Sequence, residues 1–149
     1  MNYNEPIFFI PGNVPSLKNS KIKTSRGIFP SKTVTKYLRS FNIIQFSSGR
    51  KEVKYKRNSD KIFLESFCPY FLKFDRNQPI IANFHFIRGS AHKFDFNNAT
   101  QIISDLFTAH DFIVDDNMDY FIPMPFKVKD KWYSYDKNNP GVWIKLTQE

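Results

Sequence analysis

A change of hydrophobic period between residues 80 and 109 constrains the fold more than any other feature of this chain. Residues 80–88 (IIANFHFIR) alternate between two faces, which is typical of a β-strand. Further along, the apolar residues follow helical spacing in the stripe Ala99, Ile102, Ile103, Leu106 and Phe107. The short apolar run 112–114 is interpreted as a second strand. The chain therefore predicts a strand–helix–strand unit, with Asn97 or Asn98 capping the helix.

The remaining segments indicate further elements around this unit. Three more strands are expected, at residues 7–10, 120–128 and 141–146, and residues 28–30 could form a further brief strand. Two more helices are expected, beginning at Ser31 and at Ser59, the second with Ile62, Phe63 and Phe67 on its buried side. Two basic segments are expected outside them, a loop over 13–27 and a loop or helix start over 51–57. Trp132 and Trp143 are expected in the core or in an interface.

This order of elements favours one α/β or α+β domain over residues 1–149, with a mixed sheet flanked by about three helices. Pro123 and Pro125 place the strand over 120–128 at an edge of that sheet, because proline cannot donate to a neighbouring strand. Pro69 interrupts the second helix for the same reason.

The acidic residues of the chain are concentrated in one segment. Six of the 14 Asp and Glu residues lie between residues 95 and 119, and this segment contains no Lys or Arg. The rest of the chain carries 22 Lys and Arg against the other 8 acidic residues, so a formal charge of −6 faces one of +14. Like charges held close together raise each other's pKa or recruit a cation. The segment is therefore either a metal site or a solvated helix and loop.

Composition limits the classes of function. The net charge of +8 and the pI of about 9.6 favour a polyanionic partner, because binding releases its counterions. Cys68 is the sole cysteine, which excludes an intramolecular disulfide and a Cys₂His₂ zinc site. The N-terminal apolar run has no basic region before it, and no apolar stretch approaches the ~20 residues of a membrane span. We expect a soluble cytoplasmic protein.

Acidic residues from the two ends of the strand–helix–strand unit would meet if the unit forms as expected. Asp95 lies just before the helix, and Asp115 and Asp116 follow the second strand. Carboxylates brought side by side in this way can share Mg²⁺, which usually takes one or two carboxylates plus water and phosphate oxygens. Such an ion can orient a water molecule and stabilise the leaving oxygen in phosphodiester cleavage. Gln101 and Asp105 project together from the polar face of the helix.

These residues also resemble the signature of a known family. Asp95-x-x-Asn98, then Asp105-Leu106-Phe107, then Asp115-Asp116 resemble the pattern of RusA-type Holliday junction resolvases. That pattern is D-x-D-N-x-x-K-x-x-x-D-x-L, a short loop, an apolar pair and D-D. The spacing from Asp95 to Asp116 is matched without gaps. The segment PSLKNSK, residues 15–21, is similar to the N-terminal segment of the family, so the resemblance spans most of the chain.

The resemblance implies a homodimeric, Mg²⁺-dependent endonuclease that resolves four-way DNA junctions in recombination and repair, often encoded by a prophage; Mn²⁺ could replace Mg²⁺. By position, it implies that the catalytic residues are Asp95, Asn98 and Asp116. The metal site that it implies is drawn from Asp95, Asn97, Asp105, Asp115 and Asp116. The residues expected to contact DNA are Lys18, Asn19, Lys21, Arg88 and Lys93.

The chain departs from the family signature at two positions. Asn97 stands where the signature has its second metal-binding Asp, and Gln101 stands where it has its catalytic Lys. Asn97 can offer a neutral oxygen, whereas Gln101 cannot supply a cation to a developing negative charge. Residues elsewhere could replace the missing charges: Asp105, Asp115 or Asp119 for the carboxylate, and Lys18, Arg88 or Lys93 for the cation.

Two alternatives to an active nuclease stay open. The first is a DNA-junction-binding protein of the same fold that no longer cuts. The second is an unrelated basic protein whose acidic cluster is structural.

Overall fold

The computed structural model describes residues 7–16, 21–24 and 27–149. Its largest sheet, in the described residues, has five strands in the order β1-β9-β6-β7, with β8 also paired to β6. These strands are β1 (Ile7–Pro11), β6 (Ile80–Arg88), β7 (Phe121–Pro125), β8 (Ser134–Tyr135) and β9 (Gly141–Thr147). The pairs β1–β9 and β9–β6 are antiparallel, whereas β7 and β8 run parallel to β6. The predicted α+β fold with a mixed sheet is therefore confirmed, and β7 lies at an edge.

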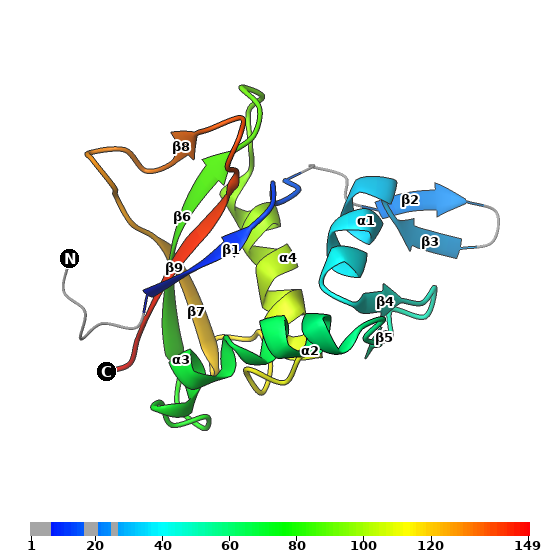
Figure 1. The fold of residues 1–149 in the computed structure, drawn as a ribbon, viewed down its shortest axis with the longest axis horizontal. Coiled ribbons are helices and arrows are strands. Elements are labelled where there is room, and N and C mark those ends of the chain that lie inside the picture. The colour runs from blue at the N-terminus through cyan, green and yellow to red at the C-terminus, as the bar shows by residue number, and fades with distance from the viewer. Residues whose placement is uncertain (1–6, 17–20, 25–26) are drawn as a thin grey trace.

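The helices lie on one side of this sheet and beside it (Figure 1). They are α1 (Lys32–Ser40), α2 (Asn58–Glu65), the short α3 (Cys68–Leu72) and α4 (Phe96–Ala109). Two hairpins accompany α1, away from the main sheet: β2 (Lys21–Thr24) with β3 (Gly27–Pro30), and β4 (Ile43–Gln45) with β5 (Lys51–Val53).

Both basic segments that we expected to lack strands contain one. β2 lies within the expected loop 13–27, and β5 lies within 51–57, where a loop or helix start was expected. Within the described residues, each of these strands pairs with its hairpin neighbour alone. With four and three residues, both strands are too short for a hydrophobic period to predict them.

One face of the main sheet forms the floor of the core. Its inward residues are all buried: Phe8, Ile10, Ala82, Phe84, Phe86, Val142, Ile144 and Leu146. The strand registers place them in rows, with Phe8 opposite Ile144 and Ile144 opposite Phe84. This alternation confirms the strand predicted over 80–88, and it is the pattern of a sheet that is covered on one face.

The helix α4 covers this floor through its predicted apolar stripe. Every residue of the stripe is at most 5% exposed. The ring of Phe107 packs 6.1 Å from Phe121 of β7, 6.3 Å from Phe8 of β1 and 5.0 Å from Phe71 of α3, measured between centroids. Aromatic contacts of this kind contribute beyond simple burial of apolar area. They fix both the position of α4 and the direction of its outer, polar face.

The segment predicted as one helix from Ser59 is divided into α2 and α3. Pro69 lies in the first turn of α3, where its missing N–H costs no hydrogen bond. The prediction of its buried side was partly wrong, because Ile62 is 61% exposed and Phe63 is 44% exposed, whereas Leu64 and Phe67 are buried. The break at residues 66–67 changes which side of the segment faces the core. A pattern based on one continuous helix cannot predict this change.

The strand predicted over 112–114 does not form, and these residues belong to the loop between α4 and β7. The backbone N–H of Phe112 donates to the carbonyl of Phe107, and Phe112 and Ile113 are buried. An apolar pair therefore anchors a loop here instead of pairing with a sheet. Since β7 begins only at Phe121, Asp115 and Asp116 lie in this loop and not at a strand end.

His110, at the end of α4, joins the main sheet layer to the part of the chain that contains α1. Its Nε2 lies 2.8 Å from the carbonyl oxygen of Phe41, and its Nδ1 lies 3.3 Å from the hydroxyl of Tyr55. Burial lowers the pKa of this imidazole below its ordinary value of 6.5, although the hydrogen bond to Phe41 opposes the shift. The folded chain therefore favours neutral His110.

We expect this histidine to make stability depend on pH. The unfolded chain binds a proton at His110 more readily than the folded chain, so the free energy of unfolding should fall as the pH drops below 6.5. Denaturant titrations across this range should show the loss in the wild type and in the control variant His92→Gln, since His92 is exposed. The variant His110→Gln should lack it, and parallel pH curves for all three proteins would contradict the assignment.

Candidate functional site

The centre of the candidate site is the side chain of Gln101, on the outer face of α4. Its Nε2 donates to Asp105 Oδ1 at 3.1 Å and to Asp116 Oδ2 at 2.7 Å. Gln101 and Asp105 are neighbours because they are four residues apart on one helix, whereas Asp116 comes from the loop before β7. One neutral amide thus holds together two carboxylates from different segments.

A third carboxylate and a lysine border the same place. An open pocket of about 440 Å³ is lined by Gly49, Lys51, Asp105, Thr108, Ala109, Asp115 and Asp116. Lys51, in β5, places its Nζ 3.8 Å from Asp105 Oδ2. Because both side chains are partly exposed, this ion pair contributes little to stability. Its importance is positional, since it brings a cation from the β4–β5 hairpin to the edge of an acidic pocket.

The loop before β7 keeps the carboxylate of Asp115 ionised. The backbone N–H of Asp116 donates to Asp115 Oδ1 at 2.7 Å, and Asn117 Nδ2 donates to Asp115 Oδ2 at 3.2 Å. The bond from the Asp116 backbone is the largest of the effects that hold the pKa of Asp115 below its ordinary range. Asp119 is exposed, and its backbone N–H donates to Asn117. Asp115 therefore stays charged at neutral pH.

Asp95 occupies a different place from the one we expected. It is the N-cap of α4, and its Oδ1 accepts from the backbone N–H of Asn98 at 3.2 Å, so the predicted cap at Asn97 or Asn98 was wrong. Six residues of helix separate Asp95 from Gln101, a rise of about 9 Å. In the described part of the chain, no three His, Cys, Asp or Glu side chains are grouped closely enough to hold a metal ion.

The two asparagines of the expected signature lie in the first turn of α4. Asn97 is exposed, and its carbonyl accepts from the hydroxyl of Thr100 at 3.1 Å. Asn98 is half-buried and receives the cap bond from Asp95 through its own backbone N–H. The expected site residues thus divide between the start of α4, with Asp95, Asn97 and Asn98, and the pocket two turns further along, with Asp105, Asp115 and Asp116.

The residues expected to contact DNA are placed differently from one another. Lys18 and Asn19 lie outside the described residues, Lys21 begins β2, and Lys93 is exposed. Arg88 is only 5% exposed. Its Nη1 donates to the carbonyl of Val14, its Nη2 lies 3.3 Å from Ser16 Oγ, and its guanidinium covers the ring of Phe94. Arg88 therefore fastens the segment after β1, and a phosphate could reach it only if this arrangement opened.

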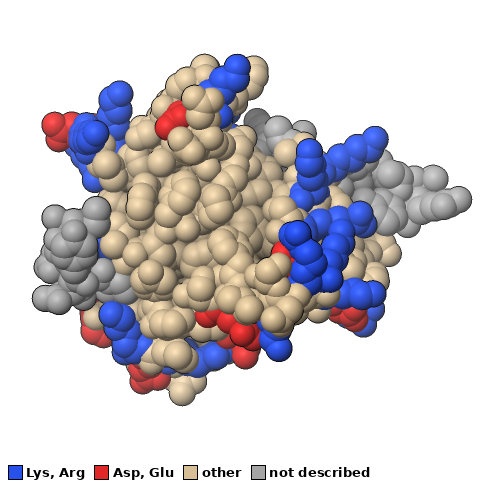
Figure 2. Space-filling view, viewed as in Figure 1, with Lys and Arg blue, Asp and Glu red and all other residues tan. Residues whose placement is uncertain are grey.

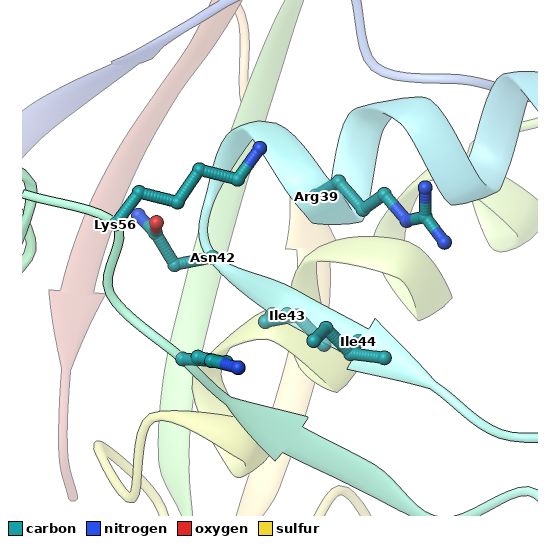
Figure 3. Close-up of a pocket in the computed structure, with 6 residues that line it drawn as sticks. Arg39, Asn42, Ile43, Ile44 and Lys56 are labelled. Atoms are coloured by element: carbon teal, nitrogen blue, oxygen red, sulfur yellow. The ribbon is translucent and has the colours of Figure 1, made fainter.

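Sequence reasoning missed a basic pocket next to α1. The pocket has a volume of about 400 Å³ and is lined by Arg39, Asn42, Ile43, Ile44, Lys54 and Lys56. Arg39 comes from the last turn of α1, Ile43 and Ile44 come from β4, and Lys56 follows β5 (Figure 3). Figure 2 shows Lys and Arg side chains gathered over the side of this face where α1 lies. Lys54 and Lys56 belong to the basic segment 51–57, but no sequence pattern linked this segment to Arg39 and Asn42, earlier in the chain.

The polar side chain at the centre of this basic pocket is Asn42. It has φ of 65°, in the left-handed region that asparagine tolerates, and its carbonyl accepts from the backbone N–H of Lys54. This turn brings the end of α1 and the segment after β5 together, and with them Arg39, Lys54 and Lys56. Three cations that border an opening without a carboxylate create a favourable position for an anion.

Comparisons with known proteins give no family. No protein-family model matches the chain, and no curated protein sequence matches it significantly. The RusA-like interpretation therefore rests on the motif and the site alone. In the helices of the described residues, none combines the length and the apolar character that crossing a membrane requires.

The pocket beside Gln101 offers the type of donor that Mg²⁺ prefers. Asp105, Asp115 and Asp116 present hard carboxylate oxygens, and Mg²⁺ needs only one or two of them when water and phosphate oxygens complete its shell. Asp105 of α4 and Asp116 of the loop before β7 would hold the ion, and the Gln101 amide, which now donates to both, would have to move aside.

The double role expected of Asp95 can be separated by two substitutions. Asp95→Ala removes the cap and should lower the free energy of unfolding by about 1 kcal/mol, whereas Asp95→Ser should retain most of it, because serine also caps helices. Denaturant titrations in EDTA measure this difference. Repeating them in Mg²⁺ tests for a ligand: if Asp95 only caps, Mg²⁺ stabilises the wild type and Asp95→Ser equally. A stabilisation by Mg²⁺ that vanishes in Asp95→Ser would instead make Asp95 a metal ligand.

Proposed function

We propose that this chain is a Mg²⁺-dependent, structure-selective endonuclease that cuts branched DNA such as four-way junctions. The observation that carries the proposal is the convergence of Asp105, Asp115 and Asp116 on one open pocket in a protein of net charge +8. Carboxylates that border one open pocket offer a divalent cation a favourable position, although hydrogen bonds already satisfy them without it. The surrounding positive charge then attracts the phosphates of the substrate.

The pocket residues have distinct roles in this proposal. Mg²⁺, when bound, supplies a Lewis acid that polarises the scissile phosphate and favours deprotonation of a water molecule. Asp116 and Asp105 would hold the ion, and Asp115 would add negative charge while its hydrogen bonds hold the shape of the loop. Lys51 is the cation at the pocket edge, where it can stabilise negative charge that develops on the phosphate. Lys51 would thereby supply the positive charge that the neutral side chain of Gln101 cannot supply.

DNA would be positioned by charge and not by base sequence. The basic pocket of Arg39, Lys54 and Lys56 belongs to the same α1–β4–β5 part of the chain as Lys51. Contacts to phosphates fix the position and orientation of DNA without reading its sequence. A homodimer with two-fold symmetry would present two equivalent pockets to the two strands of a junction, which has the same approximate symmetry.

A second candidate is a junction-binding protein that does not cut. The observation that favours it is the amide of Gln101, which already bridges Asp105 and Asp116 with hydrogen bonds of 3.1 and 2.7 Å. A site whose carboxylates are satisfied by a neutral donor has less need of a cation. In this case the acidic pocket would be a structural remnant, while the basic surface would still bind DNA.

The two candidates differ in the products that they form from a labelled four-way junction. We expect symmetric cuts in Mg²⁺ or Mn²⁺ and none in EDTA, and we expect Asp116→Asn to slow cleavage by about 100-fold or more. Gln101→Lys should slow cleavage by about tenfold or more, because its ammonium would lie between the two carboxylates and compete with the ion. Asp119→Asn, in the same loop as Asp116, is the matched control and should cut normally. Tight binding of the junction by the wild type, without cuts in either metal, would establish the second candidate.

The salt dependence of junction binding tests the basic pocket separately from cleavage. Each phosphate contact contributes about 0.9 to the slope of log K against log salt, so Arg39→Ala and Lys56→Ala should each reduce the slope by about that amount. Fluorescence anisotropy in EDTA measures binding without cuts. Lys73→Ala, on the opposite end of the helical layer after α3, serves as the control and should leave the slope unchanged. An unchanged slope in both pocket variants would remove this pocket from the DNA-binding surface.

A further inference from the structure

Three large aromatic side chains lie exposed in one short loop far along the sequence from the acidic pocket. Trp132 is 56% exposed, Tyr133 is 52% exposed and Tyr135 is 57% exposed. They belong to residues 127–137, which we name the aromatic loop; it connects β7 to β9 and contains β8. Of the two places expected for Trp132, the core is therefore excluded, and an interface stays a prediction. Clusters of exposed apolar surface on a folded chain mark binding sites.

The aromatic loop is held firmly, so the exposure of its rings does not come from a lack of structure. Val128 and Lys131 exchange backbone hydrogen bonds of 2.9 and 3.1 Å around a two-residue turn, with positive φ at both Lys129 and Asp130. Positive φ at both central residues is the geometry of a tight hairpin turn. The turn brings Lys127 beside Trp132, and its Nζ lies 5.0 Å from the ring centroid.

The far side of the loop is fastened to β6. Ser134 Oγ lies 2.7 Å from His85 Nε2, and Ser134 and Tyr135 pair with Ile87 and Arg88 in the sheet. The ring of Tyr133 packs edge-on against Phe94, with centroids 4.9 Å apart. These contacts set the backbone on which the aromatic side chains are displayed. A rigid platform loses little conformational entropy when it binds a ligand.

The charges of the loop identify the kind of ligand. Four lysines lie within it, at 127, 129, 131 and 137, against two aspartates, at 130 and 136. In the part of the chain that the structure describes, none of these lysines forms an ion pair. Aromatic rings between unpaired cations fit a ligand that has flat apolar faces joined by negative charges. A strand of nucleic acid with unpaired bases has this chemistry, because bases stack on the rings while lysines contact phosphates.

A second copy of the chain would fit this surface less well. In a two-fold interface the same patch meets itself, so two patches that each hold four lysines and two aspartates, a net charge of +2, would face each other. Like charges across an interface disfavour association. The polyanionic ligand has no such conflict.

We propose that the aromatic loop binds unpaired bases of a DNA strand by stacking, with Trp132 as the main platform. The proposal deepens the proposed function, on which it rests for the identity of the nucleic acid as DNA, because bases at a branch point of DNA become available for stacking when the pairs there open. The stacking itself needs no metal and none of the residues of the acidic pocket. It can therefore be tested in EDTA, independently of cleavage.

The first measurement is the fluorescence of Trp132. The chain contains two tryptophans, so Trp143→Phe leaves Trp132 as the sole reporter. Titration with a short oligodeoxythymidylate in EDTA should quench its emission in a saturable way, because stacked bases quench tryptophan. The reciprocal variant Trp132→Phe, which reports from Trp143, should show no such quenching. An abasic deoxyribose-phosphate strand of the same length carries the charges without the bases and should leave the emission of Trp132 unchanged.

The second measurement is affinity, from the anisotropy of the labelled oligonucleotide. Trp132→Ala should weaken binding by about 5- to 150-fold, the range expected for loss of one stacked base, and Trp132→Phe should retain most of the affinity. A paired duplex of equal length should respond much less to Trp132→Ala. Since Trp132 is more than half exposed, both variants are expected to fold.

Several outcomes would overturn the proposal. They are binding of the oligonucleotide without quenching of Trp132, an affinity that Trp132→Ala leaves unchanged, or no binding of the single strand at all. Tighter binding of an oligouridylate than of the DNA strand would overturn the assignment to DNA. A dimer in sedimentation equilibrium that Trp132→Ala converts to a monomer, with no change in affinity for the oligonucleotide, would assign the loop to a second copy. Junction cleavage that persists in Trp132→Ala would leave the nuclease proposal standing in each case.

Discussion

The aromatic contact between α4 and the main sheet is the interaction on which the rest of the structure depends. Phe107 packs against Phe8 and Phe121, and the other residues of the α4 stripe are buried with it. Burial of one such ring contributes about 1.5–3 kcal/mol, far more than any exposed ion pair in the acidic pocket. Because the inner face of α4 is fixed, its outer face is fixed as well. Gln101 and Asp105 are thus positioned by residues that take no part in the site.

This arrangement explains how an acidic cluster persists on the protein surface. Asp115 is satisfied by the loop that contains it, Asp116 by Gln101, and Asp105 by Gln101 together with Lys51. Two like charges 4 Å apart in water repel each other by only about 1 kcal/mol, which hydrogen bonds to ionised groups readily offset. The cluster therefore needs no metal to fold. A bound ion would compete with hydrogen bonds already present, so affinity for Mg²⁺ would depend on the DNA phosphates that complete its shell.

The sequence predicted the buried elements well and the exposed ones poorly, for a physical reason. The strand over 80–88 and the stripe of α4 both have a face that must be buried, and each was placed correctly because burial imposes a period on the sequence. The prediction of a strand at 112–114 was wrong, because Phe112 and Ile113 are buried as anchors of a turn. A turn imposes no hydrophobic period on the sequence. Within the site, the sequence identified Asp105, Asp115 and Asp116 through their clustering. It gave no sign of Lys51, which reaches Asp105 from 54 positions away through hairpin pairing that leaves no pattern.

The β-strand β6 connects the two surfaces that the proposals assign to DNA. β6 ends in Arg88, its last residues pair with the aromatic loop, and the chain then runs on through Asp95 into α4 and the acidic pocket. His85 lies on the face of β6 that points away from the helices, and its ring contacts Ser134 of the aromatic loop. Phe84 and Phe86 lie on the opposite face of β6, where they are buried beneath the helices. The stacking platform and the carboxylates are therefore both connected to the main sheet through β6. A DNA strand held by the aromatic loop would lie at a fixed distance from the acidic pocket. That distance, more than any recognition of base sequence, would determine which phosphates can be cut.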